Sequence, residues 1–155
     1  MRGQYRAILC DLFGTLVDGN GVALDGAAEF VDRLAHVHWA VVTSCGTSFA
    51  LRLLRQARLT QPPVLVSSDD VIETKPSPAC YLRAADLLDV PREACLVIED
   101  SSSGIEAGKA AGMDVVGVVR AGRTLSRADA TIRNLNELRV ETKPSGEIVL
   151  LTADE

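Results

Sequence analysis

Side chains suited to binding a charged oxygen ligand lie at four separate places in the sequence, namely Asp11, Thr43, Lys75 and the pair Glu99-Asp100. If the fold brings these groups together, several carboxylates share one place, which costs free energy unless a cation lies among them. Mg²⁺ prefers hard oxygen ligands and usually takes one or two carboxylates together with a substrate phosphate. These residue types therefore predict a Mg²⁺ site that also binds a phosphoryl group.

Three of these groups lie at the ends of short apolar runs, which are typical of buried strands. Asp11 follows the first run, Thr43 closes the second, and Glu99 follows the fourth. The five runs cover residues 6–10, 39–43, 64–66, 96–98 and 115–119.

Helical patterns separate the apolar runs, and Lys75 lies in the loop before the third of them. Strands that alternate with helices of this length predict an α/β fold, a doubly wound parallel sheet with helices on both faces. Ligands of such sheets bind beyond the carboxyl ends of the strands, so the candidate residues should meet at one sheet edge. The predicted helices cover residues 27–35, 49–57, 78–88 and 103–111.

The C-terminal part of the chain has a different pattern. Residues 121–129 indicate a loop, and residues 132–138 indicate a short final helix. Residues 138–151 alternate between apolar and polar types around a turn at residues 144–146, which predicts a terminal hairpin.

Length, charge and cysteine usage narrow the class of protein. A chain of 155 residues suits one domain, and we expect a core domain over residues 1–138 with residues 139–155 as an extension that forms a β-hairpin of the same domain. The net charge of −5 indicates no nucleic-acid partner. No apolar run approaches the roughly 18 residues of a membrane span. The four cysteines form no CxxC pair, so we expect free thiols in a cytoplasmic protein without a membrane partner.

Four segments of the sequence match known motifs in order. Residues 11–18 (DLFGTLVD), 41–44 (VVTS), 75–78 (KPSP) and 97–108 (VIEDSSSGIEAG) resemble the four motifs of the haloacid dehalogenase-like hydrolase superfamily. The resemblance extends from about Tyr5 to Leu138, and its second half is similar to the phosphoglycolate phosphatase and β-phosphoglucomutase branch. One such motif would be weak evidence, but four in the right order are strong, and they imply the Rossmann-like core of that superfamily.

The resemblance implies a role for each residue that would contact the phosphoryl group. Asp11 would attack phosphorus and form an aspartyl-phosphate. Thr43 would donate a hydrogen bond to a phosphoryl oxygen, with the adjacent Ser44 as the alternative donor. Lys75 would offset the charge of Asp11 and the phosphoryl group, and Gly14 would complete the substrate-binding residues.

The same resemblance implies a set of Mg²⁺ ligands. Asp11 and Asp100 would bind the cation through their carboxylates, and Phe13 would bind it through its backbone carbonyl. Glu99 would act beside them or through water. The Asp100 segment also has a simpler structural interpretation, because Asp and Ser commonly cap helices.

Phe13 departs from the pattern of the family's phosphatases, which have a second Asp at this position that protonates the leaving group. A phenyl ring transfers no proton, and loss of a positioned acid or base typically costs about 10²–10⁴ in rate. The haloalkanoate dehalogenases of the family have an aromatic residue here and use no metal. We therefore expect a slow phosphatase or phosphotransferase, with a catalytically degenerate ligand- or partner-binding protein and a dehalogenase-like hydrolase as alternatives.

The family's helical lid is also missing, because only eight residues lie between Asp18 and Ala27. Without a lid the site cannot exclude water by itself. We expect a phosphorylated substrate, either a small molecule or a macromolecule large enough to cover the cleft, or a homo-oligomer in which a neighbouring subunit covers it.

Overall fold

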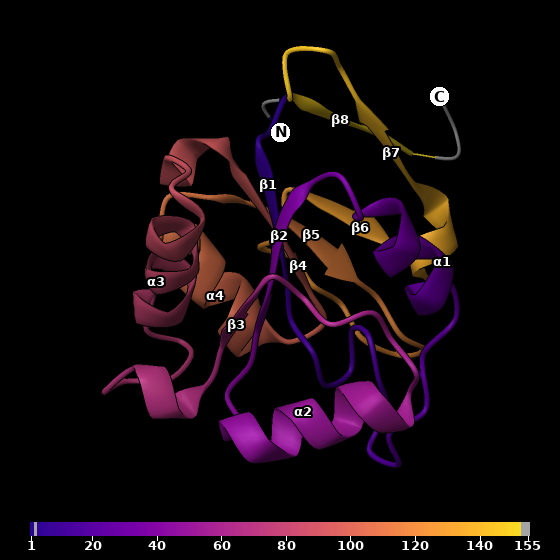
Figure 1. Ribbon diagram of the computed structural model, residues 1–155, viewed down its shortest axis with the longest axis vertical. Helices are drawn as coiled ribbons and strands as arrows, with labels where there is room; N and C mark the ends of the chain where they lie inside the picture. The colour runs from indigo at the N-terminus through magenta and orange to yellow at the C-terminus, as the bar shows by residue number, and fades with distance from the viewer. Residues whose placement is uncertain (2, 153–155) are drawn as a thin grey trace.

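A six-stranded parallel sheet forms the centre of the computed structural model, which describes residues 1 and 3–152 (Figure 1). Its strand order is β3-β2-β1-β4-β5-β6, which confirms the predicted doubly wound architecture. The strands are β1 (Ala7–Cys10), β2 (His38–Val42), β3 (Val64–Val66), β4 (Cys95–Glu99), β5 (Asp114–Val118) and β6 (Ala130–Ile132), with β7 (Leu138–Thr142) and β8 (Ile148–Thr152) outside this sheet.

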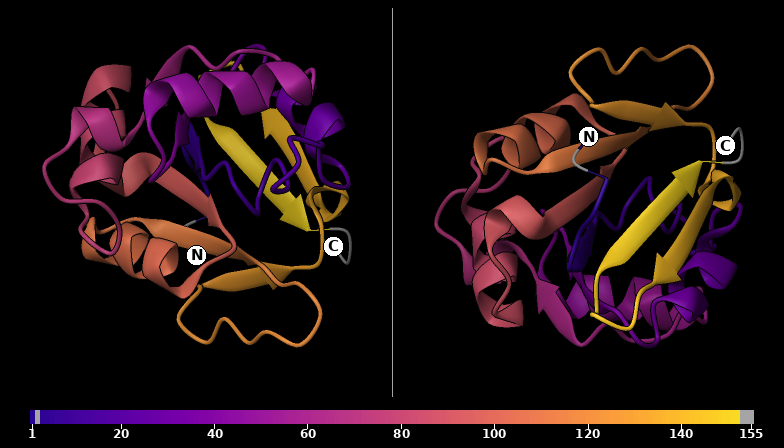
Figure 2. Two further views of the ribbon diagram at one scale, coloured as in Figure 1. Left: turned by 90° about the horizontal axis from the view of Figure 1, so that it is seen from below. Right: turned by 90° about the horizontal axis from the view of Figure 1, so that it is seen from above.

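Helices cover both faces of the sheet, and Figure 2 shows α3 and α4 on one side with α1, α2 and the β7–β8 hairpin on the other. The alternation of side chains along the strands produces two apolar cores. Ile8 packs in the core with α1 and α2, whereas Leu9 packs in the core with α3 and α4. The helices are α1 (Ala27–Arg33), α2 (Thr47–Gln56), α3 (Ala79–Leu88) and α4 (Ser102–Ala110), with short 3-10 turns η1 (Ser68–Asp70), η2 (Arg92–Ala94) and η3 (Leu135–Glu137).

In the C-terminal region, one prediction from the sequence is confirmed and one is wrong. The hairpin is present, with β7 antiparallel to β8, and it continues onto Tyr5 through two backbone hydrogen bonds with Ile148. The predicted helix at 132–138 is wrong, because Ile132 ends a strand that pairs parallel with β5. Asn134 then starts the η3 turn by accepting a hydrogen bond from the Asn136 N–H, so a cap and a buried strand end replace the helix.

The connection between β1 and α1 contains a tight turn after Asp18, as expected from the few residues between Asp18 and Ala27. The Asp18 carboxylate accepts hydrogen bonds from the backbone N–H groups of Asn20 and Val22, at 2.8 and 2.9 Å. Val17 and Ala23 form an antiparallel bridge across this turn. The turn carries no helical lid.

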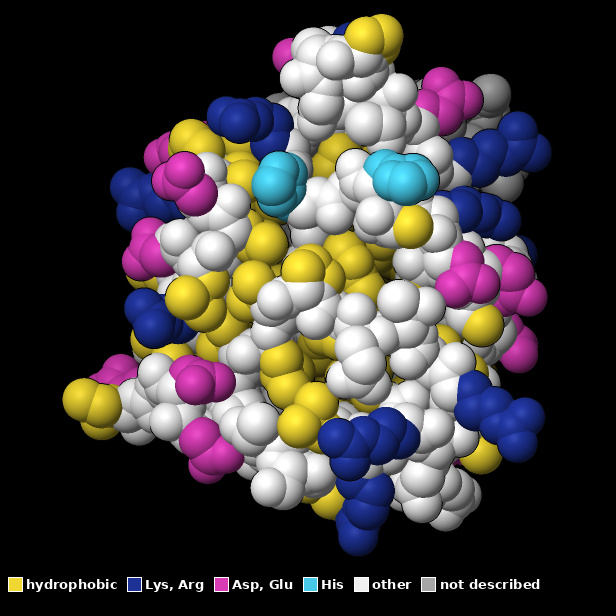
Figure 3. Space-filling model, in the orientation of Figure 1, with side chains coloured by type: hydrophobic (Ala, Val, Ile, Leu, Met, Phe, Trp, Pro, Cys, Tyr) yellow, Lys and Arg dark blue, Asp and Glu magenta, His cyan; other side chains and the backbone are white. Residues whose placement is uncertain are grey.

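Charged side chains are unevenly distributed over the face drawn in Figure 3. Basic side chains gather over α2 at the bottom, where Arg52 and Arg55 belong to that helix, and acidic side chains lie around η1 at the lower left. None of the helices in the described part of the chain is long and apolar enough to cross a membrane.

Candidate active site

Asp11 lies immediately beyond β1, where its backbone N–H donates to the Ile98 carbonyl at 3.0 Å and continues the pairing with β4. The side chain is buried. Its Oδ1 accepts a hydrogen bond from Lys75 Nζ at 2.7 Å, and its Oδ2 accepts one from Thr15 Oγ1 at 3.2 Å. Contacts to both carboxylate oxygens therefore fix the orientation of the predicted nucleophile.

Lys75 reaches the sheet edge from the loop before α3, and its side chain is only 5% exposed. Its Nζ donates to Asp11 Oδ1, to the Val42 carbonyl at 3.0 Å and to Glu99 Oε1 at 2.6 Å. Burial by itself lowers the pKa of Lys75, but the Asp11 and Glu99 carboxylates outweigh it and raise the pKa above its usual value. The ammonium group is therefore a fixed positive charge beside the Asp11 carboxylate.

Glu99 accepts hydrogen bonds from five donors. Its Oε1 accepts from Lys75 Nζ and from the Tyr81 hydroxyl at 2.8 Å. Its Oε2 accepts from the backbone N–H groups of Asp100 and Ser101 and from Ser101 Oγ, at 3.0–3.2 Å. Because both oxygens are occupied in this way, Glu99 holds Lys75 in place and fixes the first turn of α4.

Asp11, Glu99 and Asp100 place one carboxylate oxygen each within 4.8 Å of one another. Burial and, secondarily, Glu99 raise the pKa of Asp11 to about 7 against the opposing effect of Lys75. Burial and Glu99 also raise the pKa of Asp100, which Arg120 partly opposes. Lys75, with Arg120 and Arg123 acting on Asp100, compensates these three carboxylates only in part, since the pKa values of Asp11 and Asp100 stay raised. The donor set therefore fits a hard divalent cation.

Two glycines allow the carboxylates to come this close. Gly14 has a φ of +88°, and the position that a Cβ would take there is already filled by the Asp100 carboxylate. Gly104 lies in the first turn of α4, and the position that a Cβ would take there is filled by the Glu99 carboxylate. Any side chain at either position would displace an acidic group of the cluster.

Other predicted site residues lie on the solvent side. Phe13 is 52% exposed, and its ring lies over Gly19, 3.4 Å from the position of a Cβ there. Ser44 is exposed. Thr43 is buried at the end of β2, and its Oγ1 lies 3.2 Å from Cys45 Sγ and accepts from the Cys45 N–H.

Three residues that contact the site were not predicted from the sequence. Thr15 and Tyr81 donate to Asp11 and Glu99, as described above, and an Nη of Arg120 donates to the Gly14 carbonyl. Thr15 stands four residues after Asp11, whereas Tyr81 has the sequence pattern of an ordinary core residue of α3. Arg120 follows β5 at the same sheet edge as the other site residues, which is the one signal that could have indicated it.

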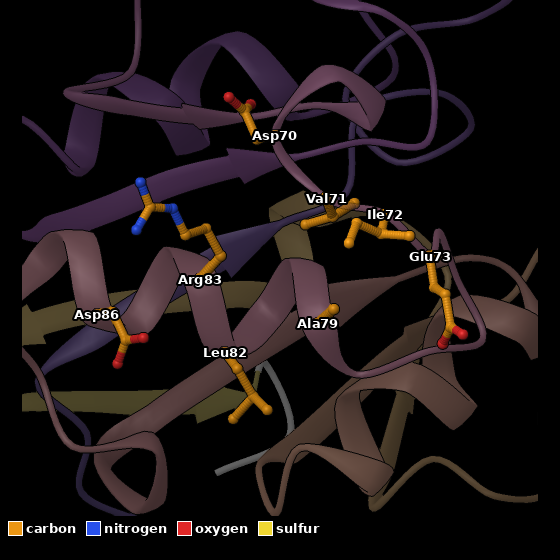
Figure 4. A pocket seen from close by; sticks show the side chains of 8 residues that line it. All are labelled: Asp70, Val71, Ile72, Glu73, Ala79, Leu82, Arg83 and Asp86. Carbon is orange, nitrogen blue, oxygen red and sulfur yellow. The ribbon is translucent and has the colours of Figure 1, made fainter.

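A cavity of about 490 Å³ lies away from these residues, between η1 and α3 (Figure 4). Figure 4 shows acidic side chains from both segments at its rim, with Leu82 on its α3 side. None of the predicted catalytic residues lines it. The lining residues are Asp70, Val71, Ile72, Glu73, Ala79, Leu82, Arg83 and Asp86.

The chain is similar to one family of known proteins along most of its length. Residues 14–118 match the haloacid dehalogenase-like hydrolase family. The chain is 33% identical to hexitol phosphatase A of Escherichia coli over 132 residues, which cover 83% of this chain and 61% of the relative. It is 30% identical to β-phosphoglucomutase of Bacillus subtilis over 119 residues, which cover 76% of this chain and 52% of the relative.

A solved structure shows the same fold. The structure of CbbY from Rhodobacter sphaeroides in complex with phosphate superposes with a TM-score of 0.75 at 21% identity, covering 86% of this chain and 96% of that chain. The present chain spans less than two-thirds of the length of the curated relatives named above. The family match and the order of the strands together show that the chain belongs to the haloacid dehalogenase-like hydrolases, in the branch that includes β-phosphoglucomutase.

Proposed function

We propose that the protein hydrolyses phosphate monoesters, or transfers their phosphoryl group, through an aspartyl-phosphate on Asp11. The observation that carries this proposal is the buried Lys75 ammonium, 2.7 Å from Asp11 Oδ1 and anchored by Glu99. A carboxylate oxygen of Asp11 forms the bond to phosphorus while the bond to the leaving-group oxygen breaks. Water then attacks the aspartyl-phosphate, which releases phosphate and restores the carboxylate.

Different residues of the cluster would compensate different charges during the reaction. Asp11, Asp100 and the Phe13 carbonyl would hold Mg²⁺, with Glu99 beside them, and the cation would neutralise charge that develops on the phosphoryl oxygens. Lys75 already compensates Asp11 before substrate binds, so its positive charge is preorganised. Thr43 and Ser44, at the end of β2, would donate hydrogen bonds to phosphoryl oxygens.

Phe13 determines how fast such a reaction runs. It is exposed where the family's phosphatases carry an acid, so the leaving-group oxygen must take its proton from water. We therefore propose slow hydrolysis of alkyl phosphates. The same exposed ring favours a second candidate function, a catalytically degenerate protein that binds a phosphorylated ligand or a partner. A dehalogenase-like activity is a weaker alternative, because carbon–halogen displacement needs no cation and the cluster suits one.

The turn between β1 and α1 carries no lid, and this restricts the kind of substrate that we propose. Because the turn leaves the Phe13 side of the site exposed, the substrate itself or a second subunit must exclude water. We propose either a bulky phosphorylated substrate or self-association that covers the site. Light scattering and a substrate panel test this, and a monomer that prefers small sugar phosphates would contradict both.

The central proposal is tested with nitrophenyl phosphate, with and without Mg²⁺, and by trapping labelled phosphate on the protein. We expect Mg²⁺-dependent turnover and label on Asp11. Both should be lost in Asp11→Asn and kept in Asp86→Asn, which changes an exposed aspartate of α3. Turnover that persists in Asp11→Asn would refute the nucleophile, and no turnover or label in the parent would favour the degenerate alternative.

A further inference from the structure

A small polar cavity lies between the β1–α1 segment, the end of β5 and the start of η3. Its volume is about 170 Å³, and its walls include Thr15, Asp25, Arg120, Arg133 and Asn134. Neither Asp11 nor Lys75 lines it, although Thr15 and Arg120 lie between it and the catalytic cluster. We propose that this cavity binds a small oxyanion, with inorganic phosphate as the reference ligand.

Arg120 provides the first reason. One Nη donates to the Gly14 carbonyl, but Nε is buried and has no hydrogen-bond partner among the residues that the structure describes. A buried N–H without an acceptor is uncommon in proteins and costs free energy. Nε itself is closed off from solvent, so an oxyanion in the cavity would accept from the Nη groups of Arg120, whose guanidinium group lines it.

The charges of the cavity wall provide the second reason. Arg133 is exposed, and within residues 1 and 3–152 only its backbone N–H is engaged, by Glu137 Oε2 at 3.3 Å. Two guanidinium groups and one carboxylate, that of Asp25, line the cavity, which leaves the wall with an excess positive charge. Guanidinium groups bind oxyanions through paired, charge-assisted hydrogen bonds.

Two other polar side chains of the wall already have hydrogen-bond partners. Thr15 Oγ1 donates to Asp11, and Asn134 Oδ1 accepts from the Asn136 N–H. The two arginines therefore provide most of the unused hydrogen-bonding capacity of the cavity. The two guanidinium groups outnumber the one lining carboxylate, that of Asp25, so donors exceed acceptors and favour an anion over a cation.

The volume restricts the ligand further. Pockets for sugar- or nucleotide-sized ligands typically measure about 300–1,000 Å³, well above the 170 Å³ available here. A water molecule occupies about 30 Å³, so the cavity has room for a tetrahedral oxyanion with a few waters. Its ligand is therefore a free anion and not the substrate of the catalytic site.

Equilibrium dialysis of labelled phosphate against the whole protein tests the proposal. We expect two classes of site in the parent, and in Arg133→Gln we expect one of them to weaken by about tenfold or more. Arg133→Lys should lose less, because it keeps the charge without the planar fork. Arg83→Gln is the matched control, since Arg83 is an exposed arginine that lines a different cavity.

Crystals soaked in selenate identify the position of the second site. An anomalous peak between Arg120 and Arg133 would support the proposal. Phosphate binding that is identical in the parent and Arg133→Gln would overturn it, and so would an adventitious ion only, seen in soaked crystals without binding in solution. This measurement requires no turnover, so failure of the proposed catalytic function would leave its result unaffected.

Discussion

The two sides of the candidate site differ in how completely their polar groups are paired. On the inner side, Lys75, Glu99 and Tyr81 are buried side chains that bond to one another or to the backbone. On the outer side, Phe13 and Ser44 are exposed. The inner side is preorganised for charge compensation before any ligand arrives, whereas the outer side leaves proton transfer and substrate selection to water and to the substrate.

The difference indicates which functions the sheet edge itself can supply. Parallel strands that end together place Asp11 and Glu99 beside each other without help from distant segments. Closing the outer side requires additional chain, and the tight turn after Asp18 contains none. The fold thus holds the Asp11 carboxylate rigidly while leaving the outer side of the site open.

Removal of the inner cation should have the largest effect. Lys75→Met leaves Asp11 and Glu99 buried with their common partner gone. We expect a loss of about 3–5 kcal/mol in unfolding free energy and a fall in turnover of about a hundred- to a thousandfold. Denaturant unfolding and nitrophenyl phosphate hydrolysis measure the two effects.

Lys109→Met is the control for this prediction. Lys109 forms a close ion pair with Asp129, but both side chains are partly exposed, at 32% and 24%. Such a pair contributes about 0.2–1 kcal/mol, and turnover should be unchanged. Equal effects of the two substitutions would contradict the distinction between the inner side and the surface.

The second prediction concerns the pH dependence of stability without metal. The folded state raises the pKa of Asp11 from 3.8 to about 7, so between these pH values the folded protein holds a proton that the unfolded chain has lost. Stability should therefore fall as pH rises through this window, by an amount on the order of 4 kcal/mol. Denaturation in chelator at pH 4.5 to 7.5 should show this slope.

Asp11→Asn separates this effect from the other titrating groups. The amide does not titrate, so the variant should lose most of the slope and be more stable than the parent at the upper end of the window. Asp100, whose pKa is also raised, should leave a smaller slope in the same direction. A parent and variant with the same pH dependence would show that Asp11 is already ionised in the folded protein.

The third prediction changes the outer side. Phe13→Asp supplies the missing carboxylate, and because the ring is half exposed the cost in packing should be small. Turnover of alkyl phosphates should rise by about tenfold or more, while Mg²⁺ affinity changes little. Steady-state kinetics and calorimetry measure these two quantities.

Phe49→Asp provides the comparison, since Phe49 is another exposed phenylalanine, at 41%, near the start of α2. It should not increase turnover. If Phe13→Asp folds, binds Mg²⁺ and gains no activity, proton transfer does not limit this protein, and the degenerate alternative becomes the better interpretation.

The sequence predicted the strand ends of the site well, because a buried strand is a local pattern and parallel strands end together. Asp11, Thr43 and Glu99 were each placed from an apolar run beside them. The contacts of Tyr81 and Arg120 were not predictable in this way, because their partners lie 18 and 106 residues away. β6 was missed because three residues at the edge of a sheet carry too short a pattern to distinguish a strand from a helical turn.

The smallest predicted effect concerns the Tyr81 hydroxyl, which donates to Glu99 at 2.8 Å while the ring lies 5.1 Å from Lys75 Nζ. Tyr81→Phe removes one of five donors to Glu99 and keeps the ring beside the ammonium group. We expect a loss of about 1 kcal/mol in stability and a fall in turnover of less than about tenfold, because Lys75 keeps its bonds to both carboxylates.

Tyr5→Phe is the control that shows whether the effect of Tyr81→Phe is specific to the candidate site. Tyr5 is also a buried tyrosine whose hydroxyl donates to a buried carboxylate, that of Asp114 at 2.7 Å, but it contacts β5 and the hairpin and not the catalytic residues. Its loss should cost similar stability and leave turnover unchanged. If Tyr81 merely stabilises the fold, the two variants will show the same kinetics. If it positions Lys75 through Glu99, only Tyr81→Phe will lower kcat, with KM little changed, because an interaction that orients the charge beside the nucleophile matters most in the transition state.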